Sequence, residues 1–433
     1  MSAEKQGKRR VVLIGDPSSK RSVFFRKAAD SLGIEVQAVP WDDVSGKLNL
    51  ERLQGLEEKY DAKGLRKESG RNDWKELPGA AVRSDWKELP EAAVRSDWKE
   101  LPGAAVKIDP PAYQTIELCR MQEQLKEYQR NLYRLAQTDC CFLNPPETIC
   151  GMLDKRETNL RLKAHGVPVT EMFPEEVRTA MQLEEIMEQR NCYSVFVKPR
   201  YFSGAAGVAA FRIHPGMGRR KLYTSCRLEQ GQLINTKRLV CLEENAKIKA
   251  LLNQLLSLEC VVERWHPKAD FRGKSYDLRV VFQFGHIAAM VARQSKGPIT
   301  NLHLNNQALD VEELGLGETA MDQIASVCRK AYEAFSGSGN LDVKNATGSG
   351  NLDVKNAAGS GNLDVKNAAG SGIWSAGNAS GGISMAGIDL LLEKGSLRPR
   401  VIEMNGQGDL IYRDIYGENR IYQEQARVLA GLE

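Results

Sequence analysis

The sequence lacks the features that mark membrane-spanning, disulfide-bonded and metal-cluster proteins. No apolar stretch in the 433 residues approaches the ~20 residues that a membrane-spanning helix needs. Nine cysteines occur without a C-x-x-C pair, and five histidines are scattered without metal-site spacing. The polar N-terminus leads straight into an apolar run at 11–14, which is too short for a signal peptide. We therefore expect reduced thiols and a cytoplasmic protein without membrane partners.

An excess of one charge sign is also missing. The net charge is +4, from 60 Lys and Arg against 56 Asp and Glu, which leaves no basic footprint for a nucleic-acid partner. The turn at Gly15 is not followed by G-x-G-x-x-G, so a dinucleotide site is disfavoured. No Ser-His-Asp or Cys-His arrangement is evident. The hydrophobic fraction of 42% and the length fit a globular protein of two or three domains.

Two tandem arrays interrupt the chain. Residues 71–106 hold three near-identical twelve-residue copies, and residues 337–369 hold three eleven-residue copies that each contain Gly-Ser-Gly. A twelve-residue unit is short for a stacked solenoid, and the glycines disfavour a helix. We interpret both as surface-loop insertions, the second flexible to about residue 384. Two alternatives stay open: a binding array anchored by Trp74, Trp86 and Trp98, and a lid formed by the second array.

Residues 1–147 predict an α/β domain. Apolar runs at 9–17 and 34–40 flank a helical pattern at 21–32 that ends at Gly33, which is a βαβ opening. The other elements that we expect in this domain are a strand at 104–108, a helix at 113–136 and a strand at 141–144.

Residues 148–433 predict mixed helices and antiparallel strands. The apolar patterns indicate helices at 153–164, 175–190 and 318–335, and strands at 194–200, 209–213, 258–265, 276–284, 286–293, 387–392 and 401–406. The last two strands are joined by a short polar connection with Gly395 and Pro399. They therefore predict a hairpin.

The last hairpin carries oxygen ligands inside apolar runs. Glu403 and Asn405 are two residues apart and share a face, and Asp389 can reach the same face from the neighbouring strand. Buried strands seldom carry such groups without compensation. Two carboxylates and an amide oxygen suit Mg²⁺, which also takes phosphate oxygens. The alternative is an edge strand whose charges are solvated.

Two further segments carry charge in unexpected places. Lys198 lies in an apolar strand and needs an anion or a route to solvent, and the small-residue turn at 203–208 beside it can bring backbone N–H groups near phosphates. Asp277 and Arg279 share one face of the strand at 276–284. For these two, the alternative is a solvated ion pair that contributes little.

These motifs, in this order, resemble the ATP-grasp superfamily. The matching segments are LDKRETNLRLKAHGVPV, VFVKP, SGAAGV, VVERW, DLRVVF, ARQSKGPITN and GIDLLL…VIEMN. The resemblance covers about residues 150–433 outside the second array. The nearest groups are ligases that add amino acids to peptides or proteins, such as the ribosomal-protein glutamate ligases, and uncharacterised ATP-grasp proteins associated with radical-SAM enzymes. It implies a Rossmann-like pre-ATP-grasp domain at 1–147 and an ATP-grasp fold at 148–433, whose two α+β subdomains clamp the nucleotide.

The resemblance also implies site roles. By function, these are Lys155 and Lys198 for the ATP phosphates, Ala206 and Gly207 for the covering loop, Glu263 and Trp265 for the adenine and ribose hinge, Asp389, Glu403 and Asn405 for one or two Mg²⁺, and Arg279, Arg293 and Asn301 for the transferred phosphoryl group. The covering loop is less glycine-rich here than in many relatives.

The implied activity is that of an ATP-dependent carboxylate–amine ligase. Such an enzyme activates a carboxylate, on a small molecule or a peptide, as an acyl phosphate for attack by an amine and releases ADP and phosphate. Phosphoryl transfer needs positioning and positive charge more than a covalent nucleophile, which agrees with the residues. The alternatives are an ATP-binding scaffold without turnover and an ATP-dependent kinase on the same fold.

Overall fold

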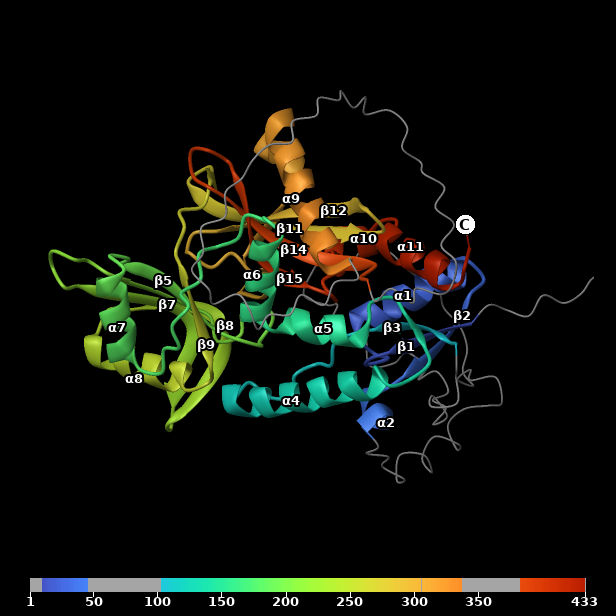
Figure 1. The fold of residues 1–433 in the computed structure, drawn as a ribbon, viewed down its shortest axis with the longest axis horizontal. Helices are drawn as coiled ribbons and strands as arrows, with labels where there is room; N and C mark the ends of the chain where they lie inside the picture. The colour runs from blue at the N-terminus through green and yellow to red at the C-terminus, as the bar shows by residue number, and fades with distance from the viewer. Residues whose placement is uncertain (1–9, 46–102, 305, 337–381, 433) are drawn as a thin grey trace, which may run out of the picture.

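Three β-sheets organise the computed structural model of the protein (Figure 1). The structure describes residues 10–45, 103–304, 306–336 and 382–432. The expectations for the second array, and for the first array up to residue 102, lie outside these residues. Figure 1 shows the five-stranded sheet at one end of the molecule and the N-terminal sheet at the other.

The N-terminal sheet is parallel, with the order β2-β1-β3-β4. Its elements are β1 (Arg10–Ile14), α1 (Lys20–Ser31), β2 (Glu35–Val39), α2 (Trp41–Ser45), β3 (Ala105–Ile108), α4 (Leu118–Leu135) and β4 (Cys141–Phe142). The predicted βαβ opening is confirmed. Ser19 caps α1 by accepting the Ser22 N–H, and Gly33 follows the helix with φ 69°.

Helix α4 begins five residues later than the prediction from residue 113. The chain before it pairs with a distant strand instead, because the Asn235 N–H donates to the Ile116 carbonyl at 2.8 Å. A backbone bridge between Glu117 and Ile234 continues this contact. As a result, α4 extends from the N-terminal sheet to the five-stranded sheet and shares one apolar core with both.

The five-stranded sheet is antiparallel, with the order β8-β7-β6-β5-β9. The elements of this part are α5 (Pro146–Leu153), α6 (Lys155–Ala164), α7 (Ala180–Gln189), β5 (Ser194–Pro199), β6 (Ala209–Ile213), β7 (Arg220–Glu229), β8 (Gln232–Leu242), α8 (Asn245–Leu256) and β9 (Cys260–Arg264). Helix α7 starts at Ala180 rather than 175, since Thr179 caps it by accepting the Gln182 N–H. Glu175 lies outside the helix and pairs with Arg190 at 2.5 Å.

The third sheet has the order β13-β12-β11-β14-β15, with β10 paired to β11. Its elements are β10 (Asp270–Phe271), β11 (Lys274–Gln283), β12 (His286–Ser295), η4 (Leu302–Leu304), β13 (Gln307–Leu309), η5 (Val311–Leu314), α9 (Glu318–Ser336), β14 (Met385–Leu392) and β15 (Pro399–Asn405). Both predicted hairpins are confirmed: β11 pairs with β12, and β14 pairs with β15.

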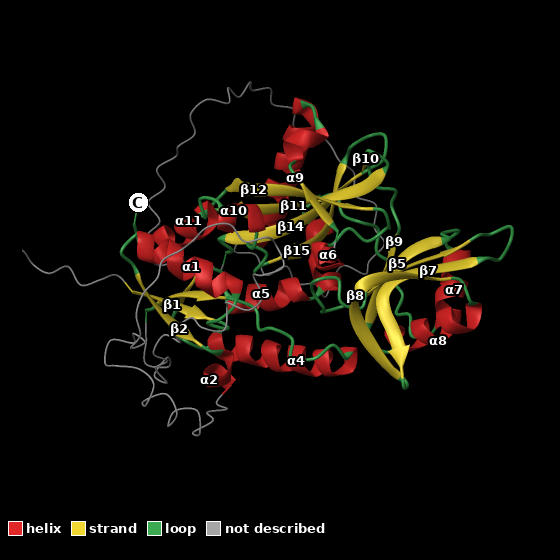
Figure 2. Cartoon of the chain, turned by 180° about the vertical axis from the view of Figure 1, so that it is seen from behind, coloured by secondary structure: helices red, strands yellow, loops and turns green. Residues whose placement is uncertain are grey.

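Side-chain alternation gives this third sheet two different faces. Leu278, Val280 and Phe282 pack in one core with α9, so Asp277 and Arg279 lie on the opposite face. Farther along that face, Val281 and Met385 pack with α1 and with α11 (Arg420–Leu429), which follows the short helix α10 (Tyr412–Tyr416). Figure 2 shows α1 and α11 side by side from behind, so the two ends of the chain share a core.

Asn144 ties the chain after the N-terminal sheet to the last hairpin. Its Nδ2 donates to the carbonyls of Met385 and Gly406 at 2.8 and 2.6 Å, and its Oδ1 accepts the N–H groups of Ser384 and Met385.

No helix in the described part of the chain is long and apolar enough to cross a membrane. None of the nine cysteines forms a disulfide.

Candidate nucleotide and phosphoryl-transfer site

An inner cavity of about 80 Å³ lies between the five-stranded sheet and the third sheet. Eight of the predicted site residues line it: Lys155, Lys198, Ala206, Glu263, Arg293, Asn301, Asp389 and Glu403. One extended segment, 168–173, connects the two sheets beside it, since Thr170 N–H donates to the Val401 carbonyl and Phe173 N–H to the Val262 carbonyl. The cavity is thus built by both halves of the predicted clamp.

Lys198 forms an ion pair with Glu263, which supplies the anion expected for a lysine in an apolar strand. Its Nζ lies 2.7 Å from Oε2 of Glu263, which β9 places next to β5. Thr170 Oγ1 donates to the same oxygen at 2.9 Å. Glu263 is only 2% exposed, so the ammonium and the hydroxyl supply its charge compensation.

Lys155 connects three parts of the site. It begins α6, and its Nζ donates to the Phe202 carbonyl in the segment that leads into the small-residue turn. The same Nζ lies 3.7 Å from Oε1 of Glu403 on β15. The predicted phosphate-binding lysine therefore stands beside a predicted metal ligand.

The small-residue turn at 203–208 depends on left-handed backbone conformations. Gly204, Ala205 and Gly207 have φ values of 67°, 63° and 71°. A Cβ on Gly207 would lie 2.5 Å from Pro199 Cγ, so glycine is required there. Gly207 packs against β5, and Ala206 lines the inner cavity.

Trp265 does not line the inner cavity. Its indole packs on Phe196 and Tyr223, with ring centroids 5.4 and 6.2 Å away. Phe196 and Phe202 are the phenylalanines that line the cavity. Trp265 thus packs on β5 and β7, and its predicted place in the nucleotide site is not what the structure shows.

A buried chain of alternating charges runs across the third sheet. Arg279 Nε lies 2.7 Å from Asp389 Oδ1, and Arg293 contacts both Asp389 Oδ2 at 3.0 Å and Asp277 Oδ1 at 2.7 Å. Lys268 ends the chain, with its Nζ 3.2 Å from Asp277 Oδ2 and 2.7 Å from Thr300 Oγ1. Asp277 and Arg279 therefore do not form a solvated ion pair with each other; their partners are Arg293 and Asp389.

The chain shifts the ionisation of its members. Burial alone would raise the pKa of Asp277, but the charges of Arg293 and Lys268 outweigh it and hold that pKa well below its usual range. Burial lowers the pKa of Arg279. Burial also lowers the pKa of Lys268, a residue that the sequence reasoning missed.

The predicted metal ligands fit a Mg²⁺ ion chemically. Asp389 and Glu403 lie directly opposite each other in the β14–β15 ladder, and Gly387 is the partner of Asn405. Asp389 Oδ1 is buried and accepts no hydrogen bond, although Arg279 Nε lies close by. Within the described residues there is no cluster of three or more His, Cys, Asp or Glu side chains that could hold a metal. The candidate ligands are therefore the carboxylates of Asp389 and Glu403 and the amide oxygen of Asn405. Mg²⁺ binding by these residues remains a prediction.

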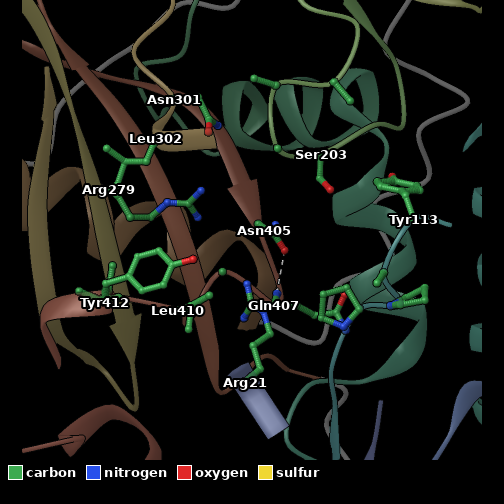
Figure 3. Close-up of a pocket in the computed structure, with 18 of the residues that line it drawn as sticks. Arg21, Tyr113, Ser203, Arg279, Asn301, Leu302, Asn405, Gln407, Leu410 and Tyr412 are labelled. Atoms are coloured by element: carbon green, nitrogen blue, oxygen red, sulfur yellow. Dashed lines mark hydrogen bonds between the residues drawn. The ribbon is translucent and has the colours of Figure 1, made fainter. Parts of the chain in front are cut away.

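An outer cavity of about 2480 Å³ adjoins the inner one, and Figure 3 shows the side chains around it. Arg279 and Asn405 face it, and so does Arg21 from α1. Asn405 Oδ1 accepts the Gln407 N–H at 2.8 Å. Arg293 and Asn301 line both cavities, so the two spaces meet at these residues.

A second buried ion cluster borders the outer cavity and was not predicted. Lys107 Nζ contacts Asp109 and lies 3.0 Å from Asp409 Oδ2, and Arg21 donates to Asp409 Oδ1. The sequence held a signal, because Lys107 sits in an apolar strand as Lys198 does. The cluster fixes Arg21 at the edge of the outer cavity.

The sequence matches no protein-family model and no curated protein. Solved structures resemble the whole chain. D-cycloserine synthetase DcsG superimposes with a TM-score of 0.51 at 14% identity, over 97% of this chain and 99% of that one. Carboxyaminoimidazole ribonucleotide synthase from Aspergillus clavatus, complexed with ATP, gives 0.50 at 13% identity, over 98% and 78%.

A RiPP-associated ATP-grasp ligase from Chryseobacterium gregarium, in complex with ADP and a leader and core peptide, gives a TM-score of 0.47 at 12% identity, over 97% of this chain and 96% of that one. The structures of D-cycloserine synthetase DcsG and carboxyaminoimidazole ribonucleotide synthase each match nearly the full length of this chain. This protein has the fold of the ATP-grasp superfamily.

Proposed function

We propose that the protein is an ATP-dependent ligase that activates a carboxylate as an acyl phosphate for attack by an amine. The observation that carries this proposal is the junction of the two cavities at Arg293 and Asn301. Nucleotide phosphates in the inner cavity and a carboxylate in the outer cavity would meet there. Arg293 is fixed by two carboxylates, so its guanidinium is oriented before any substrate arrives.

The nucleotide occupies the inner cavity in this proposal. Lys155 and Lys198 hold its phosphates, and Glu263 lies at the adenine and ribose hinge. Asp389, Glu403 and Asn405 would hold Mg²⁺, which neutralises phosphate charge when bound. An 80 Å³ cavity is smaller than the roughly 300–1,000 Å³ of small-molecule sites, so the proposal requires the cavity to widen when the nucleotide binds.

The carboxylate substrate occupies the outer cavity. Arg279 and Arg21 approach this space from the third sheet and from α1, and guanidinium groups suit carboxylate recognition. A carboxylate oxygen attacks the terminal phosphorus of ATP, and the bond to ADP breaks. An amine then attacks the acyl carbon, phosphate leaves, and the amine loses a proton.

The outer cavity favours a large substrate. Its volume of about 2480 Å³ exceeds the roughly 1,000 Å³ at the upper end of small-molecule sites. A peptide carboxylate is therefore the finer proposal for the substrate class.

The first test is a thermal shift with Mg²⁺-ATP. A ligand at a hundred times its dissociation constant adds about 2.7 kcal/mol, which raises the melting temperature by several degrees. We expect this rise, followed by ADP release with peptide carboxylates and a hydroxamate when hydroxylamine is present. A stable phosphorylated product without hydroxamate would favour a kinase. No rise with Mg²⁺-ATP would contradict the proposal.

A further inference from the structure

Lys268 ends a buried chain that holds more cations than carboxylates. Lys268, Arg293 and Arg279 share only Asp277 and Asp389, through contacts of 2.7 to 3.2 Å. The side chains of Lys268, Arg293 and Arg279 are 9%, 6% and 21% exposed, so solvent screens the surplus only in part and mainly at Arg279. An uncompensated buried charge is strongly unfavourable.

The other charges around the inner cavity are already matched. Lys198 is paired with Glu263, Lys155 lies beside Glu403, and Arg264 pairs with Glu171 at 2.7 Å. Among the described residues that line this cavity, four carboxylates face four cations once Arg264 is set aside. Arg279, which contacts Asp389 from the outer cavity, adds a fifth cation to this network. The surplus positive charge therefore belongs to the chain of charges that borders the inner cavity through Lys268 and Arg293.

Lys268 faces the same space as the predicted phosphate-binding lysine. Burial is the main reason why the pKa of Lys268 is lowered; Asp277 opposes this, and repulsion from Arg293 and Lys198 adds to it. Two ammonium groups that repel each other across a buried cavity are stabilised together by an anion between them.

The fold does not need the charge of Lys268. Asp277 already accepts from Arg293 Nε at 2.7 Å and from the Thr300 hydroxyl. Without Lys268, two arginines would face two carboxylates, and the chain would be balanced. A buried lysine that unbalances its own surroundings is typical of a site that is completed by a ligand.

We propose that Lys268 is a third phosphate-binding lysine, which contacts the phosphate chain of the nucleotide from the side of the third sheet. The phosphates supply the missing negative charge, and Thr300 orients the ammonium through a 2.7 Å hydrogen bond. This inference rests on the proposed function only in placing ATP in the inner cavity.

The test compares Lys268→Met with Lys274→Met, a lysine on β11 whose Nζ contacts Gln307 at the surface. Dissociation constants for ATP and adenosine are measured by calorimetry, and melting temperatures without nucleotide are measured in parallel. For Lys268→Met we expect at least tenfold weaker ATP binding, adenosine binding within twofold of wild type, and an unchanged or higher melting temperature. Lys274→Met should match wild type, and Lys268→Arg should keep most of the ATP affinity.

Two results would overturn the inference while leaving the proposed function in place. One is ATP affinity in Lys268→Met equal to that of the wild type. The other is an equal loss for ATP and adenosine together with a lower melting temperature, which would make Lys268 a structural residue. If ATP binding behaves as expected but no carboxylate elicits ADP release, the ligase proposal fails and this inference stands. Absence of ATP binding in wild type would overturn both.

Discussion

Arg293 and Asp277 are direct partners across the β11–β12 ladder, and the same register continues through the site. Arg279 on β11 lies opposite Asp389 on β14, and Asp389 lies opposite Glu403 on β15. A slip of one residue in any of these pairs would turn the charged groups to the face that packs against α9. The register of one sheet therefore places two arginines and three carboxylates on one face.

Replacing Asp277 with Asn should destabilise the protein strongly. The change leaves Arg293 and Lys268 buried with one carboxylate fewer, and breaking a buried pair in this way costs about 3–5 kcal/mol. Urea unfolding at pH 7 measures the loss. Glu418→Gln removes an exposed partner of Arg420 and should cost less than about 1 kcal/mol.

The cost of Asp277→Asn should also depend on pH in one direction. The folded-state pKa of Asp277 is lowered, so its stabilisation is complete above the unfolded pKa of about 3.9 and is lost as the pH falls through the folded pKa. The gap in unfolding free energy between wild type and variant should be constant from pH 7 to 5 and should narrow below about pH 4. A gap that already shrinks between pH 7 and 5 would contradict the assigned shift.

Glu403→Gln should remove metal-dependent nucleotide binding. The amide keeps the shape of the side chain but loses the charge that suits Mg²⁺, so we expect roughly a 10–100-fold or greater loss of Mg²⁺ affinity and a matching loss of ADP release. The readout is the thermal shift with ATP at several Mg²⁺ concentrations. Glu424→Gln, on α11 beside His286, is the matched control. A wild-type rate in Glu403→Gln would show that this carboxylate holds no metal.

Much of the third sheet could be predicted because its strands are continuous apolar runs that carry a few charged residues. Asp389 and Glu403 stood out for that reason, and their pairing follows from the hairpin. The β7–β8 hairpin was missed although a signal was present. Gln230 and Gly231, both with positive φ, form the two-residue turn that such hairpins prefer.

Other features depend on contacts that no local pattern encodes. Lys268 lies between Pro267 and Ala269 without strand or helix periodicity, and only tertiary packing places its side chain, 9% exposed, beside Asp277 and Thr300. The contact of Arg21 with Asp409 joins residues 388 positions apart. The sequence also predicted helix starts too early where residues before the helix cap it or pair with a distant strand. An example is Thr179, which caps α7.

Gly408→Ala should displace Arg279. A Cβ at this position would lie 2.7 Å from Arg279 Nη1 and 2.6 Å from the Gly387 Cα, so the guanidinium or the turn must move. Overpacking of this kind costs about 1–3 kcal/mol, and we expect ADP release to fall further than stability does. Gly317→Ala is the control, because nothing lies within 4 Å of its Cβ position. Full ADP release in Gly408→Ala would mean that the turn yields without moving Arg279.

Asn144→Ala should destabilise both strands of the β14–β15 hairpin at once. It leaves two carbonyls and two N–H groups of buried backbone without their partner, at positions that begin β14 and follow β15. Because each unsatisfied buried group costs about 1–3 kcal/mol and some will find water, we expect a loss of about 3 kcal/mol in urea unfolding. Asn253→Ala removes a single side-chain bond to the Ala180 N–H and should cost about 1 kcal/mol. If Asn144 also positions the site, Asn144→Ala will weaken ATP binding at temperatures where the protein remains folded, and Asn253→Ala will not. Equal ATP affinities in the two variants would confine Asn144 to a stabilising role.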